Sequence, residues 1–167
     1  MRGGESMISV EQVEALPLFH RATIPADYLD PMGHMNIRWY IALFDQAAWK
    51  FFGSIGMNRP YFEEEQGGLF ALKQFINYLA EVHVGETVAI RTRVLGRSVK
   101  RLHFMHFMVN ESRQNLAATL ETLTSHADLA IRRTSPFPAR FAESLDDYID
   151  RHEQLGWSAP VCGVIQP

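Results

Sequence analysis

Two carboxylates, a histidine and an asparagine lie close together in residues 27–36, DYLDPMGHMN, directly before a long apolar stretch. Gly33 follows Asp30 by three positions and permits a backbone geometry that a Cβ would forbid. The start of a helix offers unpaired N–H groups and the positive end of the helix dipole, which can stabilise a carbonyl oxygen as it gains charge. A carboxylate held beside them could attack that carbonyl or deprotonate a water that does. The segment therefore predicts carbonyl chemistry.

The same residue types are also the usual residues of turns. Asp, Pro, Gly and Asn favour tight turns, and Asn36 could act only as a helix cap. A carboxylate at a helix start stabilises the helix by only about 0.3–1 kcal/mol, so its presence needs no catalytic explanation. Residue types alone leave both interpretations open.

Residues 37–53 predict a helix, because they contain neither Pro nor Gly until Gly53, which suits a helix end. Apolar side chains cover most of its circumference, with Gln46 and Lys50 opposite them. A helix this apolar must be surrounded by protein. Asp45 lies in the middle of the apolar face, where a bare carboxylate would be costly to bury, so we expect it to be structural or a second candidate acid.

The rest of the chain predicts a sheet to surround that helix. The expected strands cover residues 18–26, 68–83, 87–95, 101–110 and 116–132. Short turns between the last four predict an antiparallel meander. We expect an α+β fold in a single domain over residues 1–167, with a core at about 16–134 and a C-terminal helix and tail at 139–167. One long central helix is wrapped by a curved, mainly antiparallel sheet of about five strands.

Composition excludes several classes of function. A net charge of −3 without a basic block makes nucleic acid an unexpected partner. The single cysteine, Cys162, excludes an intramolecular disulfide and favours a reducing compartment. Without a signal peptide or an apolar run of about 20 residues, we expect a cytoplasmic protein with no membrane partner. Seven histidines show no HxH or HxxxH spacing, so no metal site is expected.

The string DPMGHMN at 30–36, with Tyr40 and the FDQAA run at 44–48, resembles the hotdog thioesterases of the 4-hydroxybenzoyl-CoA thioesterase type. The resemblance is specific over residues 24–52 and continues through NYLAEVHVGETV and KRLHF to PFP at 136–138. It implies the hotdog fold and hydrolysis of an acyl-CoA thioester to the free acid and CoA. Coenzyme A is then part of the substrate, and no separate cofactor is expected.

By this resemblance the catalytic carboxylate is Asp30, and the backbone N–H of Ile37 polarises the thioester carbonyl. His34 and Asn36 match a Gly-His-x-Asn variant of the element that begins at Gly33, and they line the pocket. The loop and the helix supply the expected substrate-binding residues Asp27, Gly33, Tyr40 and Asp45. A second hotdog branch places its acid on the central helix, at the position that Asp45 resembles, and Asp27 is expected to support the loop by a hydrogen bond.

Three basic residues at one predicted turn, Arg97, Lys100 and Arg101, complete the substrate-binding candidates. They could bind the phosphates of CoA, or they could be solvated charges that protect a strand edge from aggregation. GHMN, KRLH and the RR…PFP run also resemble the betainyl-CoA thioesterase branch, whose acyl group is a trimethylammonium cation. Lys73 would disfavour such a cation if it faced the pocket.

The family forms dimers with the active site between subunits, so we expect a homodimer or homotetramer. The nearly continuous apolar strand LHFMHFMV fits burial on both faces and supports that expectation. Two competing functions remain. One is a hotdog hydratase or dehydratase, and the other is a protein that binds acyl-CoA or a small ligand without hydrolysing it.

Overall fold

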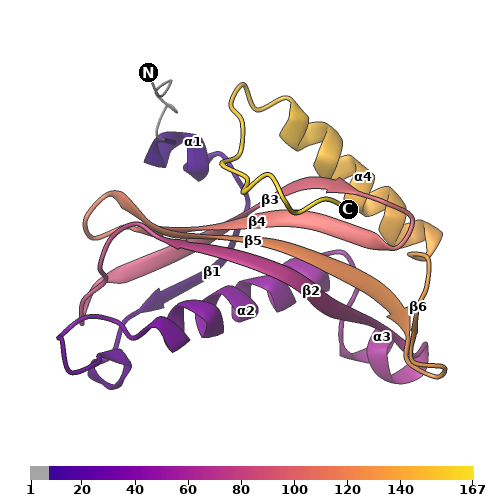
Figure 1. Cartoon of the computed structure of the whole chain (residues 1–167), viewed down its shortest axis with the longest axis horizontal. Coiled ribbons are helices and arrows are strands. Elements are labelled where there is room, and N and C mark those ends of the chain that lie inside the picture. Colours follow the sequence, from indigo (N-terminus) through magenta and orange to yellow (C-terminus); the bar gives the residue numbers. More distant parts are fainter. Residues whose placement is uncertain (1–7) are drawn as a thin grey trace.

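A curved antiparallel sheet wraps around one long helix in the computed structural model, which describes residues 8–167 (Figure 1). The helices are α1 (Val10–Glu14), α2 (Ile37–Ser54), α3 (Arg59–Glu64) and α4 (Ala139–Glu153), with a 3₁₀ turn η1 (Ala26–Tyr28). The strands are β1 (Leu18–Thr23), β2 (Gly67–Tyr78), β3 (Thr87–Arg97), β4 (Arg101–Asn110), β5 (Asn115–Asp128) and β6 (Arg133–Thr134). Their order in the sheet is β1-β3-β4-β5-β2, and β6 pairs with β5.

Helix α2 lies along the concave face of the sheet, as its apolar sequence predicts (Figure 1). Phe44 and Phe51 are fully buried and anchor two core clusters between the helix and the strands. Gly53 was expected to end the helix but remains inside it. Gly56 instead adopts the left-handed conformation, with a φ of 94°, because glycine has no Cβ to oppose it there.

Several predicted boundaries were wrong by a few residues. The three strands β1, β2 and β5 end at Thr23, Tyr78 and Asp128, earlier than expected. Helices α1 and α3 were not predicted. Residues 10–14, which lie before the expected core at about 16–134, form a helix that Ser9 and Gln12 cap reciprocally. Residues 1–7 lie outside the described residues.

The predicted four-strand meander was also wrong, because β2 pairs with β5 and not with β3. Only β3, β4 and β5 form a meander. The eight residues 79–86 between β2 and β3 are long enough to take the chain away from the β2 edge, so β2 closes the far side of the sheet. We call residues 79–86 the crossing segment.

The chain itself covers the convex face of the sheet. Helix α1, helix α4 and the C-terminal tail lie over that face (Figure 1). Val13 and Leu16 pack on the outer side chains of β4, and Trp157 packs edge-on against Phe107. The burial of β4 on both faces is therefore confirmed, but its cause is this cover, so it gives no argument for a partner chain.

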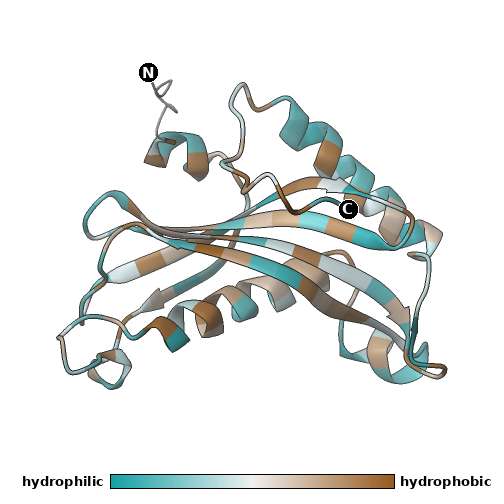
Figure 2. Ribbon diagram, viewed as in Figure 1, coloured by the Kyte–Doolittle hydropathy of each residue, from teal (hydrophilic) through white to brown (hydrophobic). Residues whose placement is uncertain are grey.

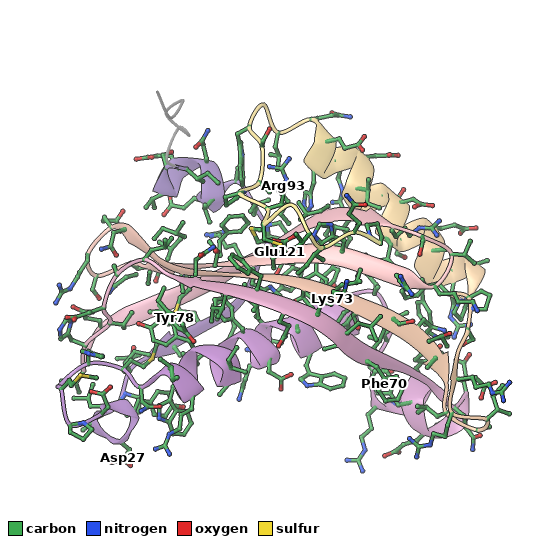
Figure 3. All side chains as sticks on the ribbon, viewed as in Figure 1. Asp27, Phe70, Lys73, Tyr78, Arg93 and Glu121 are labelled. Carbon is green, nitrogen blue, oxygen red and sulfur yellow. The ribbon has the colours of Figure 1, made fainter. Side chains whose placement is uncertain are left out.

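Polar contacts hold this cover in place. Arg93 of β3 lies beneath the tail and donates to the carbonyl oxygens of Trp157 and His152. Glu121, which is buried, contacts His103 with one oxygen at 2.8 Å and accepts a hydrogen bond from the Cys162 amide with the other at 2.7 Å. Arg93 and Glu121 therefore attach the tail to the convex face (Figure 3).

Strand β2 is the long strand that the chain leaves uncovered. Within residues 8–167 it pairs on one side only, with β5, and its opposite edge is free. The free edge carries several hydrophobic side chains (Figure 2). Those exposed on β2 are Phe70, Leu72, Phe75 and Tyr78. A long apolar edge of this kind is a template for pairing with another strand.

Candidate functional site

The loop before α2 folds into a tight turn that places its polar residues at the start of the helix. A bridge pairs Leu29 with Met35, and inside it the Asp30 amide donates to the His34 carbonyl at 3.0 Å. The Gly33 amide donates back to the Asp30 carbonyl, also at 3.0 Å. Gly33 has a φ of 88°, which side chains rarely allow, so the predicted need for glycine at this position is confirmed.

Two backbone hydrogen bonds attach this loop to its surroundings. The Met35 amide donates to the Val82 carbonyl at 2.7 Å, and the Asn36 amide donates to the Tyr28 carbonyl at 2.9 Å. The rings of Tyr28 and Trp39 stack at 3.7 Å and link the loop to the first turn of α2. The loop is therefore held on both sides before the helix begins.

The Asp30 carboxylate is held in a defined orientation. Its Oδ1 accepts a hydrogen bond from the Met32 amide at 2.8 Å, and its Oδ2 lies 3.6 Å from His34 Nδ1. Only 8% of its side-chain surface is exposed. The carboxylate therefore does not point into bulk water, and one of its oxygens has no hydrogen bond to the backbone.

Asn36 caps α2, which is the structural role that the sequence left open. Its Oδ1 accepts from the Arg38 amide at 3.1 Å, and its carbonyl accepts from the Trp39 amide at 3.0 Å. Within residues 8–167 the amide of Ile37 has no hydrogen-bond acceptor. The Ile37 amide is therefore an unpaired donor at the positive end of the helix, available to a carbonyl oxygen.

A small hollow of about 250 Å³ lies at this helix start. The loop, α2 and the residues that follow β2 supply its walls, namely His34, Met35, Ile37, Tyr40, Tyr78, Leu79, Ala80 and Glu81. Tyr40 is buried and donates from its hydroxyl to the Ala80 carbonyl at 3.4 Å. Burial raises the pKa of Tyr40, so this phenol is an unsuitable proton acceptor at neutral pH.

A larger groove of about 480 Å³ runs between α2 and the concave face of the sheet. Aromatic side chains form much of its wall, including Phe44, Trp49, Phe52 and Phe104. Asp45 also lines the groove, where its Oδ2 accepts a hydrogen bond from Trp49 Nε1 at 3.1 Å. The expectation that Asp45 sits in a covered apolar face was wrong. The carboxylate is exposed because the groove is open beside the uncovered β2 edge.

His106 forms part of the inner wall of the groove. Thr92 Oγ1 lies 2.8 Å from its Nδ1, while its Nε2 and the nearby wall residue Thr122 keep polar atoms without a partner among the described residues. Burial lowers the pKa of His106 to about 3, so near pH 7 the ring is the neutral imidazole, with a proton on one nitrogen only.

The structure does not bring the three basic candidates to the loop within one chain. Arg97 donates two hydrogen bonds of 2.5 Å to Asp146 of α4, and these hydrogen bonds raise its pKa. Lys100 and Arg101 are exposed beside it. The loop follows Thr23, which pairs with Thr87, so ten residues of β3 separate it from Arg97. That separation is roughly 33 Å.

Two further positions differ from expectation. Asp27 is exposed at the tip of the loop (Figure 3), and within residues 8–167 its carboxylate has no hydrogen bond, so the expected bond to the loop is not formed. Lys73 lies beside a β-bulge and lines neither hollow, whereas Ala71 and Gln74 on either side of it line the groove. The objection that Lys73 repels a cationic acyl group therefore no longer applies.

Glu81 is the residue of the site that the sequence did not identify. It lines the small hollow and lies 3.9 Å from His34 Nε2. We expected residues 79–83 to continue a strand, and that interpretation gave Glu81 no reason to face the loop. Because β2 ends at Tyr78, the crossing segment leaves strand geometry, and Glu81 faces the loop.

The loop, α2 and the long strands are also the elements of a known protein family. The sequence profile of the thioesterase-like superfamily matches residues 24–145, which include the loop, α2 and the long strands β2 to β5. The chain belongs to this thioesterase superfamily. The predicted hotdog fold and thioester-hydrolysing class are therefore confirmed.

Individual relatives and solved structures support this family assignment. The betainyl-CoA thioesterase of Pseudomonas aeruginosa is 26% identical over 85% of this chain and 89% of its own length. A hypothetical protein from Staphylococcus aureus, solved in complex with CoA, superposes with a TM-score of 0.77 and 25% identity, over 95% of this chain and 99% of its own. A 1,4-dihydroxy-2-naphthoyl-CoA thioesterase from Synechocystis has the same fold, with a TM-score of 0.69 and 15% identity over 78% of this chain and 97% of its own.

Residues 8–167 show neither a metal-binding cluster nor a helix suited to crossing a membrane. Residues 8–167 contain no group of three or more His, Cys, Asp or Glu side chains arranged to hold a metal ion. Among the same residues, no helix combines the length and the apolarity needed to cross a membrane.

The cap of α2 gives a stability prediction for this thioesterase. Replacing Asn36 with Ala removes the acceptor of the Arg38 amide and should lower the free energy of unfolding by about 1 kcal/mol. Urea denaturation followed by circular dichroism measures the change. Asn36→Asp keeps a capping oxygen and should retain most of the stability. An Ala variant as stable as the parent would contradict the capping role.

Proposed function

We propose that this protein hydrolyses a small acyl-CoA thioester with Asp30 as the catalytic carboxylate. One observation supports it above the others: a nearly buried carboxylate with one oxygen free of backbone hydrogen bonds stands directly before a helix start whose Ile37 amide is unpaired. Membership of the thioesterase superfamily indicates the reaction class in which such a pair acts.

In the proposed mechanism, the thioester carbonyl oxygen accepts a hydrogen bond from the Ile37 amide. The helix dipole adds to this polarisation, because negative charge develops on the oxygen as the carbon is attacked. Asp30 Oδ2 either attacks the carbonyl carbon or takes a proton from the water that does. In both routes the C–S bond then breaks and CoA leaves as a thiolate, which needs no strong general acid. In the first route this leaves an anhydride between the acyl group and Asp30, which water hydrolyses to release the acid and restore the carboxylate.

We also propose that the working form is a homodimer joined through β2. The chain covers the convex face with its own helices and tail, whereas β2 keeps a free edge and exposed apolar side chains. Pairing of two β2 edges would satisfy their backbone N–H and C=O groups. Because α1, α4 and the tail already cover the convex face, we favour a dimer through β2 over a tetramer that also uses that face.

Antiparallel pairing of β2 would also complete the site. The small hollow lies at the Tyr78 end of β2, and the larger groove meets β2 at Leu69 and Ala71. A two-fold axis near the middle of the strand would bring the Tyr78 end of one subunit beside the Leu69 end of its partner. The loop of one subunit would then face the groove of the other, so that each active site is shared.

For the acyl group we propose a short chain that ends in a quaternary ammonium. The groove places the Asp45 carboxylate among aromatic side chains, and both attract a cation without requiring a hydrogen bond. Lys73 lies outside the groove lining. The curated relative from Pseudomonas aeruginosa, named for betainyl-CoA, is consistent with this choice.

Asp30→Asn tests the catalytic assignment. We expect kcat to fall by about 10²–10⁴-fold, the usual effect of losing a catalytic acid or base, while the melting temperature changes little. Release of free CoA thiol from a panel of acyl-CoAs measures the activity. Asp150→Asn, an exposed change on α4, is the matched control. Full activity in Asp30→Asn would exclude this role, and binding by the parent without thiol release would indicate a binding protein.

Phe75→Glu tests the dimer. Placing a carboxylate on the free edge should put two like charges near each other in the pair and yield monomers at micromolar concentration. Sedimentation of the parent should give about twice the chain mass of 19.1 kDa. Ile131→Glu, an equally charged change at another exposed apolar position, should remain dimeric. A monomeric parent would contradict the proposal.

The acyl group is tested with betainyl-CoA and its neutral analogue 3,3-dimethylbutanoyl-CoA, which has the same shape without the charge. We expect kcat/KM to favour the cation by about tenfold, equivalent to ~1.4 kcal/mol. Asp45→Asn should remove most of that preference while leaving hydrolysis of the neutral analogue unchanged. Equal rates for the two thioesters with the parent enzyme would rule out a cation site.

A further inference from the structure

Two carboxylates from separate parts of the chain flank the His34 ring. Asp30 Oδ2 lies 3.6 Å from Nδ1 on one side, and Glu81 Oε1 lies 3.9 Å from Nε2 on the other. Both separations are ion-pair distances and too long for direct hydrogen bonds. Since each ring nitrogen faces a carboxylate, the orientation of the ring depends on both charges.

Glu81 has its own supporting contacts on the crossing segment. Its second oxygen lies 3.5 Å from His83 Nε2, and His83 Nδ1 lies 2.9 Å from an Arg113 nitrogen. Glu86 accepts hydrogen bonds from the His83 amide at 2.8 Å, from Asn110 at 2.7 Å and from Arg113. Acidic and basic groups thus alternate from the loop to the turn between β4 and β5.

Glu86 supplies a fixed negative charge at the far end of this array. Burial acts to raise its pKa, but hydrogen bonds from the His83 amide, Arg113 and Asn110 outweigh burial and lower the pKa. Its negative charge, together with Arg113, fixes His83 on the side of Glu81 that faces away from the loop. Glu81 therefore has an imidazole ring on each side, although 65% of its own side chain is exposed.

The other groups that face His34 are few. The small hollow also contains the phenols of Tyr40 and Tyr78, and among the described residues lining it His34 and Glu81 are the ones with a titratable imidazole or carboxylate. No arginine or lysine lines this hollow. Glu81 is therefore the charged group at the hollow that does not belong to the loop.

We propose that Glu81 is a positioning residue that acts through His34 on Asp30. Met32 occupies one Asp30 oxygen, so the oxygen beside His34 is the one left for chemistry. Glu81 holds the ring, and the ring holds that oxygen towards the helix start. This inference rests on the proposed catalytic role of Asp30. If Glu81 were only a solvated surface charge, replacing it would leave the reaction unaffected.

A double-mutant cycle with Glu81→Gln and His34→Asn tests the proposal on the dimeric enzyme. Because Glu81 is partly exposed and does not touch the reacting atoms, we expect Glu81→Gln to lower kcat by about 3- to 10-fold with KM unchanged. In the His34→Asn background the same change should have no further effect, since residues that act through one another are not additive. Glu64→Gln, an exposed carboxylate on α3, should leave kcat unchanged.

A second readout separates positioning from stability. The ring ¹⁵N and ¹H resonances of His34 should shift in Glu81→Gln, whereas the melting temperature should not change. An unchanged kcat, a loss seen only in KM, or an effect that persists in the His34→Asn background would overturn the proposal. If Asp30→Asn keeps full activity, the proposed function itself has failed. If Asp30→Asn is inactive and Glu81→Gln matches the parent, only the role of Glu81 is wrong.

Discussion

The hydrogen bond from the Met35 amide to the Val82 carbonyl, 2.7 Å long, joins the two segments on which the site depends. On one side lies the loop with Asp30, and on the other lies the crossing segment with Glu81. The bond fixes where the loop ends and therefore where α2 begins, so it also fixes the position of the Ile37 amide. Carboxylate, imidazole and helix start thus take their relative positions from one backbone contact.

That contact exists because the sheet must enclose an apolar helix. Helix α2 buries Phe44 and Phe51 against the strands, so β1 must lead into it and β2 must pass along its far side. The connection from β2 back to β3 then has to pass the helix start, and its backbone is available to the loop. The site follows from this topology, since a direct hairpin between β2 and β3 would leave the loop without Val82.

The features of the site that were predictable from sequence are those encoded in neighbouring residues. Asp30, Gly33 and Asn36 lie within one turn, and the long apolar run after them specifies a buried helix. The succession of one strand, a long helix and four further strands also came from local patterns, and it agrees with the resemblance to hotdog thioesterases. Strand pairing marks the limit of these patterns: β2 was interpreted as part of a meander, but it pairs with residues of β5 that lie 40 or more positions away.

The same limit explains the other differences. Glu81 was not identified from the sequence because its partner His34 is distant in sequence. In addition, the alternation of the polar Glu81 with the apolar Val82 is typical of a β-strand. Arg97 looked like a phosphate ligand because nothing nearby reveals Asp146, 49 residues later. Burial of β4 was predicted correctly but attributed to a partner subunit, because a periodic pattern shows that a face is covered without showing what covers it.

The attachment of the tail to Glu121 has a practical consequence for how the protein is handled. Ile165 is buried with 5% of its surface exposed, and the Cys162 amide is bonded to a carboxylate inside the convex layer. The final residues are thus a structural part of the domain, comparable to a closing strand. An affinity tag fused directly after Pro167 would compete with that packing, so a flexible spacer between the tail and the tag suits this chain better.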